Sequence, residues 1–239
     1  MAGHSHWAGI KHKKGRQDKL RSKIFSKISR EITVAAKLGS KDPETNHRLR
    51  AAIETAKEAN MPKDNINRAI NKSEIDKSIS FDSLRYEGFG PKNIALIIDS
   101  LTDNKNRTAA SIRTTLQKFG GNLGSTGSTT HFFNNCGIIH FSNKTITEVK
   151  ALEFATTVGA KDCISHKDFH EIITTKEDFY KIKNEIGKIT KSLIYSAVEW
   201  RPKNFISLSK EEATELINML ELLEENDDVQ NIFHNCKFL

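Results

Sequence analysis

The spacing of apolar residues changes near residue 84, and this change divides the chain into a helical part and a mixed part. Over about 17–38, apolar residues recur every four positions, which predicts an amphipathic helix. Two shorter amphipathic stretches follow, one opened by Asp42-Pro43 and the next by Pro62, both typical of helix starts. Three amphipathic helices with short connections predict a small N-terminal bundle.

Short strands and helices alternate after a polar linker at 71–83. The first predicted elements are a strand at Ile94–Ile98, a helix at 108–119, and two strands at His131–Phe133 and Ile138–Phe141 around a turn at Asn134–Gly137. This β-α-β-β order lacks the last α-β of a ferredoxin-like fold. The helix and strand predicted within 209–236 would supply it.

We therefore expect an α+β protein in which a three-helix bundle precedes two ferredoxin-like α+β domains, one inserted in the other. The basic N-terminal arm and the bundle would occupy 1–78. The first α+β domain would be discontinuous, built from 79–143 plus 203–239, and the inserted domain would occupy 144–202.

Positive charge is concentrated in the first third of the chain. Residues 1–77 hold 18 Lys and Arg against 9 Asp and Glu, whereas the remaining 162 residues hold 19 against 21. The first 30 residues hold nine basic side chains and one acid, Asp18. Such asymmetry is typical of a surface that binds a polyanion, so we expect a nucleic-acid partner.

The arm and the first helix carry the candidate contacts to nucleic acid. Lysines and arginines there would bind phosphates, histidines would add polar contacts, and Trp7 would stack on an unpaired base. The alternative is a solvated charged helix face with Trp7 packed on the bundle. The predicted contact residues are His4, His6, Trp7, Lys11, His12, Lys13, Lys14, Arg16, Lys19, Arg21, Lys23, Lys27 and Arg30.

Several classes of protein are disfavoured by the sequence. No apolar run approaches the roughly 20 residues of a transmembrane helix, and the N-terminus lacks the apolar stretch of a secretory signal. The cysteines, Cys136, Cys163 and Cys236, are far apart and form no disulfide or zinc pattern. We therefore expect a cytoplasmic protein with reduced thiols and without membrane contact.

Four further features have a chemical interpretation beside an ordinary structural one. The glycine-rich segment 120–128 resembles a phosphate cradle but lacks the Gly-Lys-Ser/Thr of a P-loop, so a helix stop and loop is favoured. Ala2-Gly-His4 would suit Cu(II) or Ni(II), but histidines that contact RNA or solvent are favoured. Cys163 with His166 would suit a nucleophilic dyad, but ordinary strand residues are favoured. The acidic helix 211–225 is expected to present a solvated face, with a surface for a protein partner as the alternative. We expect no catalytic activity, cofactor, metal or small-molecule substrate.

A series of short motifs, in order along nearly the whole chain, resembles the YebC/PmpR family. The motifs are Ala2-Gly-His-Ser-His-Trp7, Ile10-Lys-His12, Lys14-Gly-Arg-Gln-Asp18, Arg30-Glu-Ile-Thr-Val-Ala-Ala36, Leu49-Arg-Ala-Ala52, Asn60-Met-Pro-Lys-Asp64, Arg85-Tyr-Glu-Gly88, Leu101-Thr-Asp-Asn104, Gly120-Gly-Asn-Leu-Gly124, Glu199-Trp200 with Pro202, and Asp228-Val-Gln-Asn231. The chain departs from the family at His6, where lysine is usual, and matches poorly around His131.

The resemblance implies a helical bundle followed by two α+β domains, without catalytic chemistry. Members are described both as DNA-binding transcriptional regulators and as ribosome-associated translation factors. Because the motifs begin at Ala2, without a mitochondrial presequence before them, the resemblance implies the bacterial cytoplasm. We expect a regulator of gene expression that binds ribosomal RNA or the ribosome. The alternative is a regulator of transcription that binds double-stranded promoter DNA.

Overall fold

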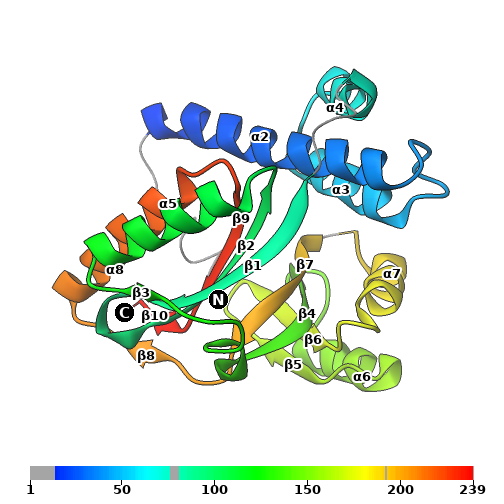
Figure 1. Cartoon of the computed structure of the whole chain (residues 1–239). Coiled ribbons are helices and arrows are strands. Elements are labelled where there is room, and N and C mark those ends of the chain that lie inside the picture. Colours follow the sequence, from blue (N-terminus) through cyan, green and yellow to red (C-terminus); the bar gives the residue numbers. More distant parts are fainter. Residues whose placement is uncertain (1–13, 76–80, 192, 239) are drawn as a thin grey trace. The chain divides into compact units, whose positions relative to one another are not determined.

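The computed structural model describes residues 14–75, 81–191 and 193–238 (Figure 1). The chain forms two compact units. One unit consists of Met1–Thr129 and Ile206–Leu239, and the other is the intervening segment Thr130–Phe205. The second unit is therefore an insertion in the first along the chain.

Three helices form the N-terminal bundle, which confirms the sequence prediction. Helix α2 (Lys14–Leu38) packs against both α3 (His47–Glu58) and α4 (Lys63–Ile75). The core of the bundle consists of Ile28, Ile32, Ala35, Ala36, Leu49, Ala52, Ala56, Met61, Ile66 and Ala69. These residues recur at helical spacing, so each helix turns one apolar face inward.

The second helix begins later than Asp42-Pro43 indicates. Residues 43–45 form a turn, and α3 starts at His47 with Asn46 as its N-cap. The side-chain oxygen of Asn46 accepts from the amide of Leu49 at 3.1 Å, and its Nδ2 donates to the carbonyl of Ala35 at 2.8 Å. Asn46 therefore caps α3 and also ties it to the end of α2.

The first α+β domain follows the bundle within the same unit. Its antiparallel sheet has the order β3-β1-β2-β9, formed by β1 (Asp82–Phe89), β2 (Ala95–Thr102), β3 (Asn122–Leu123) and β9 (Val229–His234). The short 3-10 helix η1 (Pro91–Asn93) connects β1 to β2. Helices α5 (Lys105–Lys118) and α8 (Lys210–Glu224) contribute to one core with the strands and lie side by side in Figure 1. A parallel pair, β8 (Ile206–Ser207) with β10 (Cys236–Lys237), adds a small second sheet.

The inserted unit has the complete ferredoxin-like order of elements. After η2 (Thr130–Phe132) come β4 (Phe133–Ser142), α6 (Glu148–Val158), β5 (Asp162–Ser165), β6 (Phe169–Thr174), α7 (Phe179–Ile189) and β7 (Leu193–Pro202). The sheet order is β5-β6-β4-β7. Residues of α6 and α7 pack against Ile139, Phe141 and Ile172 of the sheet to form the core.

The predicted boundary at residue 144 is wrong, because the inserted unit begins at Thr130. The predicted strand at 131–133 is mostly the 3-10 helix η2, and one strand, β4, runs from Phe133 through the predicted turn and the predicted strand at 138–141. Asn135 pairs with Trp200 and Gly137 pairs with Val198, so β4 belongs to the inserted sheet. Gly137 does not mark a turn. A Cβ at this position would collide with Thr174 and Phe179, so the glycine allows α7 to approach the strand closely. The strand that completes the discontinuous domain is β1, which the sequence prediction missed.

Candidate nucleic-acid interface

The predicted contact residues fall into three groups in the structure. His4, His6, Trp7, Lys11, His12 and Lys13 lie outside the described residues. Lys14, Arg16 and Lys19 lie in the first turns of α2, which begins at Lys14. Arg21, Lys23, Lys27 and Arg30 have described side chains further along the same helix. Their assignment to phosphate contact stays a prediction.

Three of these cations have partners within the chain that the sequence prediction did not include. Lys23 Nζ lies 3.8 Å from Glu225 Oε1, and Lys27 Nζ donates to the carbonyl of Gln230 at 3.3 Å. Arg30 Nη1 lies 2.6 Å from Asp228 Oδ1. Because the three side chains are spaced by four and three residues, they lie along one side of α2. This side of the helix is attached to residues 225–230, which run from the end of α8 into β9.

Asp228 is the centre of this attachment. Its Oδ2 accepts hydrogen bonds from Arg107 Nη2 at 2.9 Å, from the Thr108 hydroxyl at 2.7 Å and from the Thr102 hydroxyl at 3.1 Å. Arg30 completes the set on Oδ1 and also donates to the carbonyl of Leu101 at 3.0 Å. Burial alone would raise the pKa of Asp228, but these donors outweigh it and lower the pKa to about 2. Asp228 is therefore a carboxylate at neutral pH, with a fixed structural role.

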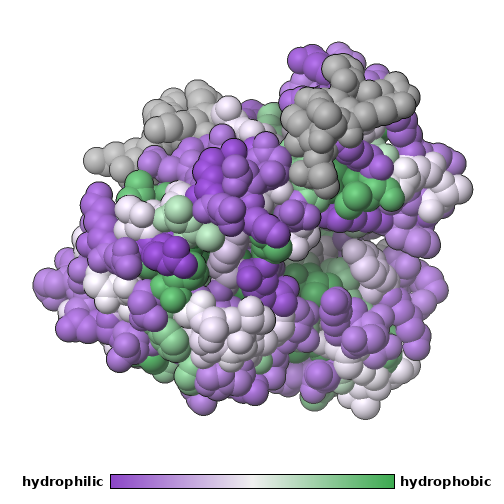
Figure 2. Space-filling view, in the orientation of Figure 1, coloured by the Kyte–Doolittle hydropathy of each residue, from purple (hydrophilic) through white to green (hydrophobic). Residues whose placement is uncertain are grey.

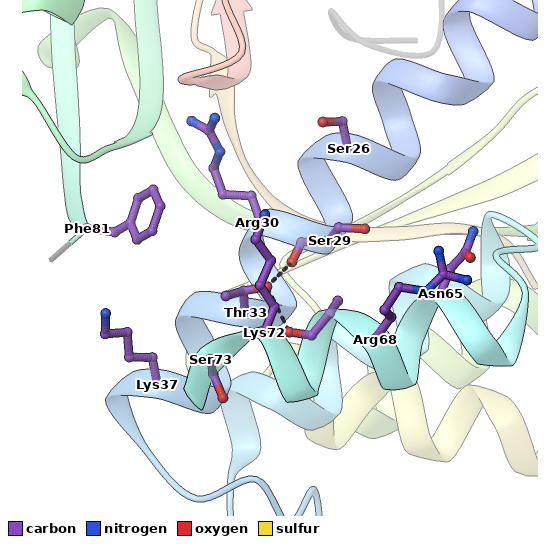
Figure 3. A pocket seen from close by; sticks show the side chains of 11 residues that line it. Ser26, Ser29, Arg30, Thr33, Lys37, Asn65, Arg68, Lys72, Ser73 and Phe81 are labelled. Carbon is purple, nitrogen blue, oxygen red and sulfur yellow. Dashed lines mark hydrogen bonds between the residues drawn. The ribbon is translucent and has the colours of Figure 1, made fainter. Parts of the chain in front are cut away.

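A cationic pocket lies between α2 and α4, and Arg30 and Phe81 are among the residues that line it (Figure 3). Its volume is about 480 Å³. None of the residues that line it, all in the described part of the chain, is acidic. The lining residues are Ser26, Ser29, Arg30, Thr33 and Lys37 from α2, Asn65, Arg68, Ala69, Lys72 and Ser73 from α4, and Phe81. We call this site the α2–α4 pocket.

Local sequence explains how the two helices frame the α2–α4 pocket. The lining residues of α4 recur at helical spacing, next to the buried face that holds Ile66 and Ala69 against α2. The Thr33 hydroxyl lies 2.8 Å from the carbonyl of Ala69 and 2.9 Å from that of Ser29, so it ties the floor of the pocket together (Figure 3). The sequence analysis did not single out Arg68 and Lys72, although their spacing of four residues is a signal for one cationic helix face.

The surface around these helices suits a polar ligand. Figure 2 shows hydrophilic side chains over most of the face in view, with apolar side chains only in small separate patches. Arg21, Arg68 and Lys72 are all exposed on the bundle. Exposed cations attract phosphates, because neutralising a phosphate releases its condensed counterions.

The glycine-rich segment 120–128 does hold an anion, but the anion belongs to the chain itself. The carboxylate of Glu87 accepts from the amide of Gly127 at 2.8 Å and from the amide of Thr129 at 2.7 Å. Glu87 is only 3% exposed. Since these amides already satisfy an internal carboxylate, the segment serves as a structural loop, which agrees with the interpretation favoured from the sequence.

The other chemical interpretations gain no support from the described residues. Burial raises the pKa of the Cys163 thiol, and burial lowers the pKa of His166, which weakens both members of the considered dyad. The structure places no group of three or more His, Cys, Asp or Glu side chains to hold a metal within residues 14–75, 81–191 and 193–238. Ala2-Gly-His4 lies outside these ranges. No helix in the described ranges has the length and apolar character needed to span a bilayer.

Comparison with known proteins identifies the family. Residues 5–75 match the TACO1/YebC protein N-terminal domain, and residues 81–236 match the TACO1/YebC second and third domain. A probable transcriptional regulatory protein of Pelagibacter ubique is 50% identical over 238 residues, covering 100% of this chain and 99% of the relative. A probable transcriptional regulatory protein of Maricaulis maris is 45% identical, over 98% of this chain and 95% of the relative.

A solved structure supports the same assignment. The crystal structure of a conserved hypothetical protein from Aquifex aeolicus is 40% identical to this chain, with a TM-score of 0.83 and coverage of 98% of each chain. This similarity extends over the bundle and both α+β domains. The chain belongs to the TACO1/YebC family.

Proposed function

We propose that this protein is a non-enzymatic regulator of gene expression that binds nucleic acid through its N-terminal third, and that its target is ribosomal RNA. The observation that carries the proposal is the confinement of all excess positive charge to residues 1–77. These residues include the basic arm and the bundle, on which Arg21, Arg68 and Lys72 are exposed. The two α+β domains are close to neutral, so they would shape the fit to the ribosome while the bundle supplies the attraction.

A second candidate is binding of double-stranded DNA in the control of transcription, which the names of the relatives favour. The arrangement of the helices gives this candidate less support. The connection between α2 and α3 spans residues 39–46, longer than the tight turn of a helix-turn-helix. Helices α3 and α4 are joined by a shorter turn, but both pack mainly against α2. RNA targets suit this bundle because they need no recognition helix in a major groove.

Fractionation on sucrose gradients separates the candidates. If ribosomal RNA is the target, the protein will sediment with ribosomal particles at low salt and return to the top of the gradient at high salt. Footprinting on genomic DNA would show a defined protected site if the target is promoter DNA. Protein that stays at the top of the gradient at low salt would refute the assignment to the ribosome.

Replacing Lys13, Lys14 and Arg16 together with glutamate is expected to weaken binding to ribosomal RNA by on the order of 100-fold, because attraction to phosphates becomes repulsion. Filter binding measures the affinity, and circular dichroism checks that the helices remain. The matched control is Lys150, Lys176 and Lys181 to glutamate, which makes the same charge change at exposed positions of the inserted unit. If the two triple variants bind ribosomal RNA with equal affinity, the arm and the first turn of α2 are not part of the binding surface.

A further inference from the structure

The α2–α4 pocket gathers cations from two helices around one volume. Arg30 and Lys37 come from α2, and Arg68 and Lys72 come from α4. Arg30 is already paired with Asp228, but its bonds to Asp228 and to the carbonyl of Leu101 both use Nη1, and a guanidinium has five N–H donors. The remaining lining residues are neutral. The combined field of the four cations therefore favours an anion inside the pocket.

The neutral residues of the pocket are suited to hydrogen bonding. Ser26 and Ser29 place two hydroxyls one turn apart on α2, and Asn65 places an amide on α4. Hydroxyls and amides are the side chains that, together with lysine and arginine, contact phosphate oxygens and sugars in protein complexes with nucleic acids. The serines are also small, which leaves the pocket open.

The size of the pocket distinguishes a bare ion from a larger ligand. Its volume of about 480 Å³ far exceeds the roughly 30 Å³ that one water molecule occupies in the liquid. Pockets for organic ligands start at about 300 Å³. The ring of Phe81 forms an apolar wall, with the Arg30 guanidinium 5.8 Å from the ring centroid. A phosphate together with its attached sugar fits this combination of volume, charge and apolar wall better than a free ion does.

We propose that the α2–α4 pocket binds one phosphate and its sugar in the backbone of the bound nucleic acid. The inference rests on the proposed function and deepens it, because it places a defined backbone contact on the far part of α2 and on α4. Asp228 holds Arg30 in place before the ligand arrives, so part of the pocket is preorganised.

The first test measures the salt dependence of binding of the full-length protein to ribosomal RNA. Each phosphate neutralised contributes about 0.7 to 0.9 to the slope of log affinity against log salt concentration. We expect Arg68→Ala with Lys72→Ala to lower that slope by about 1. Lys150→Ala with Lys181→Ala removes two exposed lysines from α6 and α7 as the control, and its slope should match that of the wild type. Equal slopes for the two double variants would overturn the proposal.

A second variant tests whether the RNA enters the pocket or is only attracted by the positive charge around it. Ser29→Phe fills the pocket without a change of charge, and Thr55→Phe adds the same ring at an exposed position of α3. We expect Ser29→Phe to weaken RNA binding at least tenfold and Thr55→Phe to leave it unchanged, with thermal unfolding as the check on folding. Wild-type affinity in a folded Ser29→Phe protein would show that no backbone group enters the pocket.

Titration with inorganic phosphate tests whether the ligand of the pocket is the nucleic-acid backbone or a small phosphorylated molecule. Amide chemical shifts at Ser29, Arg68 and Lys72 should respond to phosphate, and RNA should displace it. A phosphate response without any effect of the pocket variants on RNA binding would assign the pocket to a small phosphorylated molecule and overturn the backbone contact. If the wild-type protein binds neither RNA nor DNA, the proposed function fails and the backbone contact with it, and the phosphate response then reports on the pocket alone.

Discussion

Replacing Asp228 with alanine is expected to lower the free energy of unfolding by about 3 kcal/mol. The substitution removes the carboxylate that accepts from Arg30, Arg107, Thr102 and Thr108, and leaves their donors without that partner. Breaking a buried ion pair costs about 3–5 kcal/mol, and the lower end applies here because the Arg107 side chain is 55% exposed. Urea denaturation followed by circular dichroism measures the change.

Asp99→Ala provides the matched control for this prediction. Asp99 also accepts from an arginine, Arg85, at 2.9 Å, but both side chains are partly exposed. A pair of this kind contributes about 0–1 kcal/mol. Hydrogen exchange of the Asp228→Ala protein should rise along α2, because Arg30 loses its anchor. A loss of stability no larger than that of the Asp99 control would contradict the central role of Asp228.

The bundle could be predicted from the sequence because its signal is local. Apolar residues at helical spacing define the buried face of α2 within one stretch of chain, and Ile28 and Ile32 are indeed buried. There is also a physical reason why strand β1 could not be predicted from the sequence. It contains Glu87, whose charge argues against a buried strand, whereas in the structure the loop amides of Gly127 and Thr129 satisfy this carboxylate.

The candidate site could be predicted only in part, because much of it depends on contacts between distant residues. The concentration of charge near the N-terminus is visible in the sequence, so the bundle could be chosen as the binding region. The partner of Arg30, Asp228, is 198 positions away, and no local pattern links the two. The α2–α4 pocket likewise depends on how α4 is rotated against α2, which is fixed by packing at Ala69 and Thr33.

Another buried carboxylate, Glu171, lies in the inserted sheet and binds two neighbouring side chains. Its Oε2 lies 2.8 Å from His140 Nε2, and its Oε1 lies 2.6 Å from Arg201 Nη1. Since a carboxylate only accepts, His140 presents its Nε2–H to Glu171. The side chain of Glu171 is 2% exposed, and that of His140 is 4% exposed. Burial would raise the pKa of Glu171, but the hydrogen bonds from His140 and Arg201 outweigh it and lower the pKa to about 2.

Glu171→Gln is expected to cost on the order of 3 kcal/mol at pH 7, because a fall in pKa from 4.5 to about 2 corresponds to about 1.36 kcal/mol per unit. The folded state favours the carboxylate, so this stability is complete above pH 4.5 and is lost as the pH falls from 4.5 towards 2. The neighbouring Glu199 has a raised pKa through burial and acts in the opposite direction. The charge of Glu171 contributes to that raised pKa, so the difference in stability between wild type and variant reports on Glu171 together with its effect on Glu199.

Urea denaturation at a series of pH values from 7 to 3 measures this difference in free energy of unfolding. It should be largest at pH 7 and shrink steadily below pH 4.5, because in this range Glu171 takes up a proton in the unfolded chain while it stays ionised in the folded protein. Glu153→Gln, at an exposed position of α6, is the control and should stay within about 0.5 kcal/mol of the wild type. A difference that stays constant down to pH 3 would show that Glu171 stabilises the sheet through packing alone, without its charge.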